Sequence, residues 1–198
     1  MTITLTSDNT KLISTPAQIK EKIGVIATEM ITRLTSQTED IHLICILEGA
    51  RKFSNALRAE IESQGFACKM SYIKTVGTID TQLKDEIELK YGNLPKASHF
   101  KEQSVYVVDD LIDSGKTAVA ICDHLSSLGY EAVQIVALFN KHKDCTLADI
   151  VGFDLAYDTQ ELAKIGVKDY WLFGYGMDLD GEFREMEEVK ALIIPQIS

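Results

Sequence analysis

Residues 105–117 read VYVVDDLIDSGKT, and this stretch decides the fold of the 198-residue sequence. Its first four residues are apolar without a break, which is typical of a strand buried on both faces of a parallel sheet. A helix is predicted over 118–128, and Gly129 ends it. Three acids and a short polar turn stand between the two elements. The stretch therefore predicts a strand–helix unit of an α/β domain.

The rest of the sequence continues this alternation. One helix is predicted from Pro16, behind a capping box at Thr15, to about Arg33, and another over 53–61. Further strands are predicted at 41–47, 66–74, 87–90, 133–139, 170–173 and 192–194. The pattern favours an α/β fold with a mostly parallel central sheet flanked by helices, in one domain.

Composition limits the classes of function. The net charge of -10 disfavours nucleic acid as a partner, because phosphate backbones are bound by Lys and Arg. No apolar run is long enough to span a membrane, and the first residues do not resemble a signal peptide, so we expect a cytoplasmic protein without a membrane partner. The four cysteines lack metal-ligand spacing, so free thiols in a reducing compartment are expected.

The segment after the predicted strand offers ligands for a sugar phosphate. Asp109 and Asp110 can accept hydrogen bonds from vicinal hydroxyls or bind Mg²⁺. The following turn opens a helix, where backbone N–H groups and hydroxyls can surround a phosphate. The turn residues are Asp113, Ser114, Gly115, Lys116 and Thr117. Together these groups predict a site for a ribose 5-phosphate.

Three other interpretations of this segment compete with a ribose 5-phosphate site. A Walker A loop would need Gly where Asp110 stands. A plain N-cap by Asp113 or Ser114 would require no ligand at all, although three acids before a GKT sequence go beyond what a cap needs. A divalent-metal hydrolase would need more His or carboxylate ligands nearby than the sequence provides.

The stretch at 105–117 resembles the thirteen-residue signature of the type I phosphoribosyltransferases. Three further segments narrow the resemblance to the hypoxanthine-guanine branch of that family. These are LEGA at 47–50, VALFNK at 136–141, and GYGMD at 174–178 followed by FRE at 183–185. The segments occur in the family's order, and the resemblance extends from about residue 15 to residue 192.

The resemblance implies a fold and a reaction. It implies a core over about 38–155 and a small hood built from the chain termini, about 1–14 and 156–198, within a single domain at 1–198. It implies that 5-phosphoribosyl diphosphate (PRPP) binds with Mg²⁺, and that a 6-oxopurine displaces pyrophosphate to give IMP or GMP. Positioning and charge stabilisation would supply most of the catalysis.

The resemblance also implies a role for each motif residue. Asp113 would act as acid/base at the purine, and PRPP would be bound by Asp109, Asp110, Asp113, Ser114, Gly115, Lys116 and Thr117. Pyrophosphate would meet Glu48, Gly49 and Arg184, and metal would be held by Asp109, Asp110 and Asp178. The purine would be bound by Lys141, Trp171 and the backbone of Leu172. Family members are usually oligomers, so a homodimer or homotetramer is expected.

Three departures from the family pattern affect these expectations. The family usually has Lys where Glu48 stands, and the loss of that cation should weaken the pyrophosphate subsite. No Ser-Tyr pair is found at 76–79, where the family's mobile lid would have one. The stretch 156–168 is longer than expected and could form an extra helix. A regulatory protein that binds PRPP or a nucleotide with weak turnover therefore stays as the alternative to a purine salvage enzyme.

Overall fold

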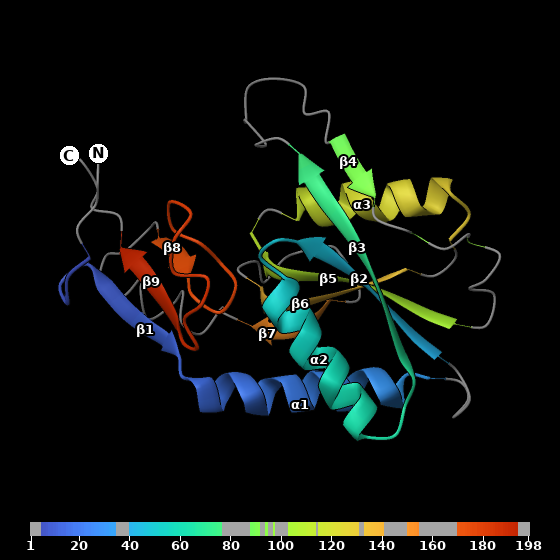
Figure 1. Ribbon diagram of the computed structural model, residues 1–198, viewed down its shortest axis with the longest axis horizontal. Helices are drawn as coiled ribbons and strands as arrows, with labels where there is room; N and C mark the ends of the chain where they lie inside the picture. Colours follow the sequence, from blue (N-terminus) through green and yellow to red (C-terminus); the bar gives the residue numbers. More distant parts are fainter. Residues whose placement is uncertain are drawn as a thin grey trace.

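The computed structural model describes residues 5–34, 40–76, 88–91, 94, 97, 103–113, 115–130, 133–140, 150–154 and 170–193. These residues form two sheets and the helices around them (Figure 1). The fold is α/β with a mostly parallel central sheet flanked by helices, as the sequence predicts. No helix in these ranges is both long and apolar enough to cross a membrane.

The larger sheet has the strand order β4-β3-β2-β5-β6-β7. Its strands pair in parallel except β4, which is antiparallel to β3. The strands are β2 (Asp40–Leu47), β3 (Cys68–Val76), β4 (Glu88–Tyr91), β5 (Gln103–Ile112), β6 (Gln134–Asn140) and β7 (Ile150–Asp154). All were predicted except β7, which is short and contains Gly152. The carboxyl ends of the parallel strands meet at one edge, where ligands of such sheets bind.

Strand β5 is longer than the sequence predicts. The apolar run ends at Val108, but the ladder with β6 continues and pairs Asp109 with Ala137 and Ile112 with Asn140. The pairing of β5 with β2 stops at Val108. Asp109 and Asp110 are therefore strand residues, and the expectation that they follow the strand is wrong. Backbone pairing with β6 overrides the low strand propensity of Asp.

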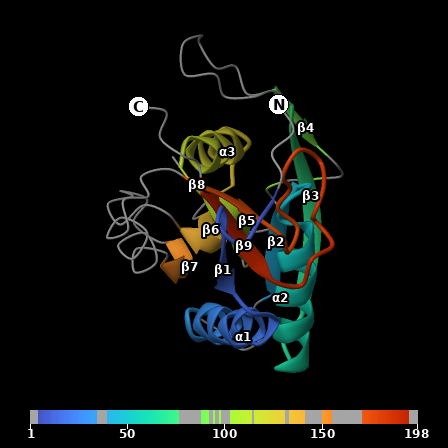
Figure 2. The same cartoon turned by 90° about the vertical axis from the view of Figure 1, so that its left-hand side faces the viewer.

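Helices cover both faces of the larger sheet. They are α1 (Pro16–Thr32), α2 (Arg51–Ser63) and α3 (Lys116–Ser127). The predicted capping box forms between Thr15 and Gln18. Buried residues of α1 and α2 pack with Leu43 and Tyr106, whereas those of α3 pack with Ile44 and Val107. Because successive strand residues point to opposite faces, α3 lies on the face opposite to α1 and α2 (Figure 2).

The smaller sheet joins both ends of the chain. Its order is β1-β9-β8, with β1 at Thr10–Ser14, β8 at Tyr170–Phe173 and β9 at Val189–Ile193. Both pairings are antiparallel. We call this sheet, with the segment 174–188 between β8 and β9, the hood. A hood from the chain termini agrees with the expected fold, although β1 was not predicted as a strand.

Candidate active site

Two adjacent acids from β5 lie at the centre of the candidate site. Asp109 is buried with a relative exposure of 8%, and its Oδ1 accepts a hydrogen bond from the Asp110 backbone N–H at 3.0 Å. Asp110 Oδ1 accepts from the Leu111 N–H at 3.0 Å. Burial, followed by the charge of Asp110, holds the pKa of Asp109 well above its usual range. Burial also raises the pKa of Asp110. The pair therefore favours a shared proton or a cation.

The chain approaches Asp110 closely where β2 leads into α2. The peptide bond between Leu47 and Glu48 is cis. A Cβ at Gly49 would lie 1.9 Å from Asp110 Oδ2, so only glycine fits here. The residues predicted for pyrophosphate and those predicted for ribose are thus in direct contact.

The hood closes the other side of Gly49. Gly176 has φ 102°, and a Cβ there would lie 2.2 Å from the Gly49 carbonyl oxygen. Arg184 donates from Nη1 to the Gly176 carbonyl at 2.7 Å, and the Gly176 N–H donates to the Arg184 carbonyl at 2.9 Å. The positive charge of Arg184 lowers the pKa of Asp110, against the effect of burial. Arg184 therefore lies beside the acid pair, although about 70 residues separate them in sequence.

The hood also places an aromatic ring beside an acid. The Trp171 side chain is exposed, with a relative exposure of 54%, and its Nε1 donates to the Asp178 carbonyl at 2.9 Å. The Asp178 carboxylate pairs with Arg184 at 2.5 Å and accepts from the Gly181 N–H at 2.9 Å. Leu172 is buried in β8, which pairs with β9 along one side. An exposed, oriented indole offers a face on which a planar base can stack.

The turn predicted to bind phosphate leads from β5 into α3. Its N-cap is Gly115, which has φ 74° and carries no side chain that could cap the helix. Asp113, Lys116 and Thr117 surround it, and Asp113 and Lys116 are exposed. The interpretation as a plain cap by a side chain at the N-cap position does not fit a glycine there. The first N–H groups of an α-helix have no partner within the helix, and α3 begins shortly after β5 ends, so this turn can offer them to an anion.

The structure brings together half of the fourteen predicted residues. Contacts or charge effects connect Glu48, Gly49, Asp109, Asp110, Trp171, Asp178 and Arg184. Ser114, Lys141 and the stretches 77–79 and 156–168 lie outside the described residues. The individual roles of all these residues stay predictions.

A magnesium ion fits the acid pair. Carboxylate oxygens are the ligands that Mg²⁺ prefers. Burial raises the pKa of both acids, and the charge of Asp110 adds to the rise at Asp109, so a divalent cation there would stabilise the charged carboxylates. Mg²⁺ also usually keeps several waters and relies on substrate phosphates for other ligands. In the described ranges, no three His, Cys, Asp or Glu side chains gather for a metal.

Sequence reasoning missed two basic residues at the start of α2. Arg51 pairs with Glu48, its Nε lying 3.1 Å from Oε2. Lys52 Nζ donates to the carbonyls of Glu185 and Met186 at 3.1 and 3.0 Å, and it pairs with Glu187. Both belong to a helix whose apolar pattern alone was used. For Arg51 the available signal was its spacing of three residues from Glu48, whereas the hood partners of Lys52 are 133 to 135 residues away in sequence.

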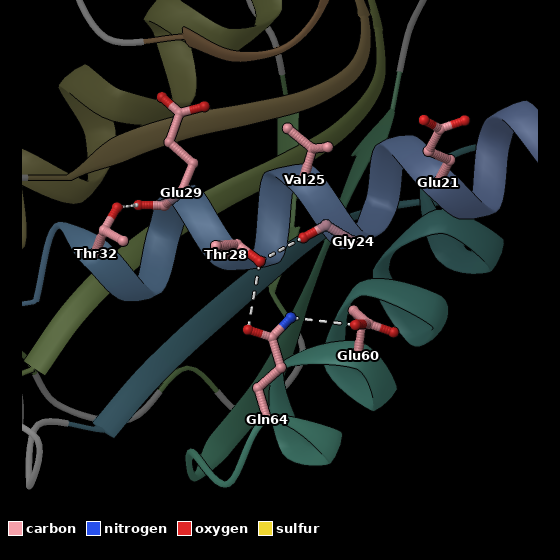
Figure 3. Close-up of a pocket in the computed structure, with 8 residues that line it drawn as sticks. All are labelled: Glu21, Gly24, Val25, Thr28, Glu29, Thr32, Glu60 and Gln64. Carbon is pink, nitrogen blue, oxygen red and sulfur yellow. Dashed lines mark hydrogen bonds between the residues drawn. The ribbon is translucent and has the colours of Figure 1, made fainter.

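A hollow of about 580 Å³ lies elsewhere, between α1 and α2 (Figure 3). Its polar groups already bond to one another: Thr28 Oγ1 donates to the Gly24 carbonyl at 2.9 Å, and Gln64 Nε2 donates to Glu60 at 3.1 Å. None of the predicted site residues lines it. The carboxyl edge of the sheet, and not this hollow, is therefore the candidate site.

Known proteins similar to this chain include several phosphoribosyltransferases. Hypoxanthine-guanine-xanthine phosphoribosyltransferase of Plasmodium falciparum is 27% identical over 190 residues, which cover 90% of this chain and 75% of that protein. Hypoxanthine phosphoribosyltransferase of Escherichia coli K12 is 22% identical and is covered to 92%. The crystal structure of the Leishmania donovani hypoxanthine-guanine enzyme has a TM-score of 0.72 at 16% identity, covering 92% of this chain and 99% of that one.

The family model for the phosphoribosyl transferase domain matches residues 16–161, which is most of the chain. That range includes β5, the acid pair and the turn at the start of α3. The chain therefore belongs to the phosphoribosyl transferase domain family.

Proposed function

We propose that this protein is a purine salvage phosphoribosyltransferase that converts hypoxanthine, guanine or both, with PRPP, to IMP or GMP and pyrophosphate. The observation that carries the proposal is that Gly49 lies against the Asp110 carboxylate and that the charge of Arg184 acts on the same carboxylate. It joins a pair of acids suited to ribose hydroxyls and Mg²⁺ to a backbone and a guanidinium suited to pyrophosphate.

Each group has a place in the proposed reaction. Asp109 and Asp110 hold the ribose hydroxyls directly or through Mg²⁺, which balances the charge of the diphosphate. The turn around Gly115 binds the 5-phosphate at the start of α3. The Asp113 carboxylate holds the proton of the purine nitrogen, and the positions of both substrates do the remaining work. Trp171 stacks on the base, and Lys141 donates to its exocyclic oxygen.

The alternative is a regulatory protein that binds PRPP or a nucleotide with little turnover. The observation in its favour is Glu48, whose exposed carboxylate stands where pyrophosphate would lie. An enzyme is favoured because a sensor has no need for Asp113 or for Arg184 beside the acid pair.

The test is pyrophosphate release by the full chain with PRPP, Mg²⁺ and hypoxanthine, guanine or xanthine. Asp113→Asn should slow turnover by about 10²-fold or more and leave PRPP binding within a few-fold, because general acid–base catalysis contributes on that order. The matched control is Asp123→Asn, which changes an exposed acid on α3 and should alter neither turnover nor PRPP binding. PRPP binding by a wild-type protein that turns over no purine would favour the regulatory alternative.

A further inference from the structure

Three cationic side chains gather around the carboxylate of Glu48. Arg51 Nε and Nη2 lie 3.1 and 3.4 Å from its two oxygens. Lys74 lies opposite Leu47 in the β2–β3 ladder, one residue from Glu48. The hydrogen bond from Arg51 contributes most to lowering the pKa of Glu48, and the charges of Lys74 and Arg184 add to it. Glu48 is therefore an anion in a cationic cluster at the mouth of the site.

The guanidinium of Arg51 is held in place but remains accessible. It lies 5.6 Å from the centre of the Tyr72 ring, an arrangement that favours a cation. The Arg51 and Glu48 side chains keep 48% and 43% of their exposure. An ion pair this exposed is weak, so a stronger anion can replace the carboxylate.

We propose that Arg51 is a further diphosphate-binding residue, which Glu48 holds beside the site until a diphosphate replaces the carboxylate. The inference rests on the proposed function, because it assigns a ligand to the subsite where pyrophosphate would lie. A guanidinium fork binds phosphate oxygens as well as it binds a carboxylate, and a diphosphate carries more charge than Glu48. The exchange needs only a side-chain rotation, since Arg51 is the first residue of α2 and both partners are exposed.

The experiment is calorimetric titration of the full chain with inorganic pyrophosphate in the presence of Mg²⁺. Arg51→Ala should weaken binding about tenfold, and Arg51→Lys about threefold, because Lys keeps the charge but loses the fork. Glu48→Gln should tighten binding about threefold, because the competing carboxylate is gone. The double variant Glu48→Gln with Arg51→Ala should bind no better than Arg51→Ala alone.

Arg58→Ala is the matched control. Arg58 lies on the same helix, pairs with Glu62 at 2.8 Å, and the two side chains have exposures of 46% and 43%, close to those of the Arg51 pair. Its loss should leave pyrophosphate affinity within twofold. Thermal unfolding of every variant checks that each one is folded, and Arg51→Lys keeps the test valid if Arg51→Ala is not.

Three results would overturn the inference: unchanged affinity in both Arg51 variants, weaker binding in Glu48→Gln, or no pyrophosphate binding by the wild type. Turnover measured on the same preparations separates it from the proposed function. If the wild type turns over a purine and the Arg51 variants keep the wild-type affinity for pyrophosphate, the inference is wrong and the proposed function stands. If pyrophosphate binding depends on Arg51 but no purine is turned over, the proposed function is wrong and Arg51 is still a diphosphate-binding residue.

Discussion

Asp109 and Asp110 lie side by side in one strand and are partly removed from water. Burial raises both pKa values, and the two charges disfavour each other. Such a pair destabilises the folded protein when no cation or ligand is bound. Destabilising arrangements of this kind are common at functional sites. Position 48 carries a negative charge in Glu48, and Arg51 places a positive charge three residues away, next to the site.

Asp109→Asn should therefore stabilise the ligand-free protein at neutral pH. Between 3.8, the ordinary pKa of Asp, and its raised folded pKa, the folded protein holds a proton that the unfolded chain has lost. The free energy of unfolding thus falls as the pH rises through this window. Asp109→Asn removes this charge, and it should raise the free energy of unfolding by about 1–2 kcal/mol at pH 8 and by less at pH 4.

Urea unfolding without Mg²⁺ at the two pH values measures this difference. Asp123→Asn, at an exposed position of α3, should leave the midpoint unchanged at both. A variant that is no more stable than the wild type at pH 8 would show that the acid pair is not strained.

At the scale of elements, the ends of strands and helices place the site. β5 extends past β2 and carries two acids to the sheet edge, and Gly115 opens α3 without a capping side chain. α1 has a different role, because it packs its buried residues on the sheet and keeps Gly24 in its middle, facing the hollow next to α2.

Gly24→Ala should stabilise the protein by about 0.5–1 kcal/mol, because alanine costs less backbone entropy than glycine inside a helix. The new methyl group meets one side-chain atom, Glu60 Oε1, at 3.9 Å. Gly65→Ala is the contrasting variant, since its Cβ has open space but its φ is 89°. Gly65→Ala should lower the free energy of unfolding by about 1 kcal/mol. Thermal unfolding of the two variants measures both changes in stability. A change of the same sign and size in Gly24→Ala and Gly65→Ala would contradict the prediction.

Part of this arrangement could be predicted from the sequence. The motifs at 105–117 and 174–185 located the acid pair and Arg184, because each combines residue types that one ligand needs. The end of β5 could not be predicted, since the ladder with β6 depends on residues about 28 positions away. Arg51 could not be assigned either, because its pair with Glu48 looks like an ordinary helical contact until Lys74 and Arg184 are placed beside it.

At the scale of the whole molecule, one lysine ties the hood to the core. Lys52 on α2 donates to two hood carbonyls, pairs with Glu187 at 2.7 Å, and lies 5.1 Å from the centre of the Tyr175 ring. The contact holds the hood against Gly49, and therefore sets the position of Arg184 relative to the acid pair. We propose that core and hood act as one domain over 1–198.

Lys52→Met should lower the free energy of unfolding by about 2 kcal/mol, because two carbonyls lose a charged donor. Hydrogen exchange should rise in 174–187 more than in α3. Lys69→Met removes an exposed pair with Asp40 and should cost less than 1 kcal/mol. Uniform loss of protection across the chain would argue against a specific tie to the hood.

The pairing of β1 with β9 has a consequence for synthesis. Thr10 pairs with Leu192, so the first described strand finds its partner only when almost all of these 198 residues have left the ribosome. The described strands of the larger sheet all lie before residue 155, so this sheet can assemble earlier. Contacts between residues so far apart in sequence form slowly. A nascent chain can therefore carry the larger sheet before the hood, with Arg184, is in place. Activity would then begin only after translation of the hood.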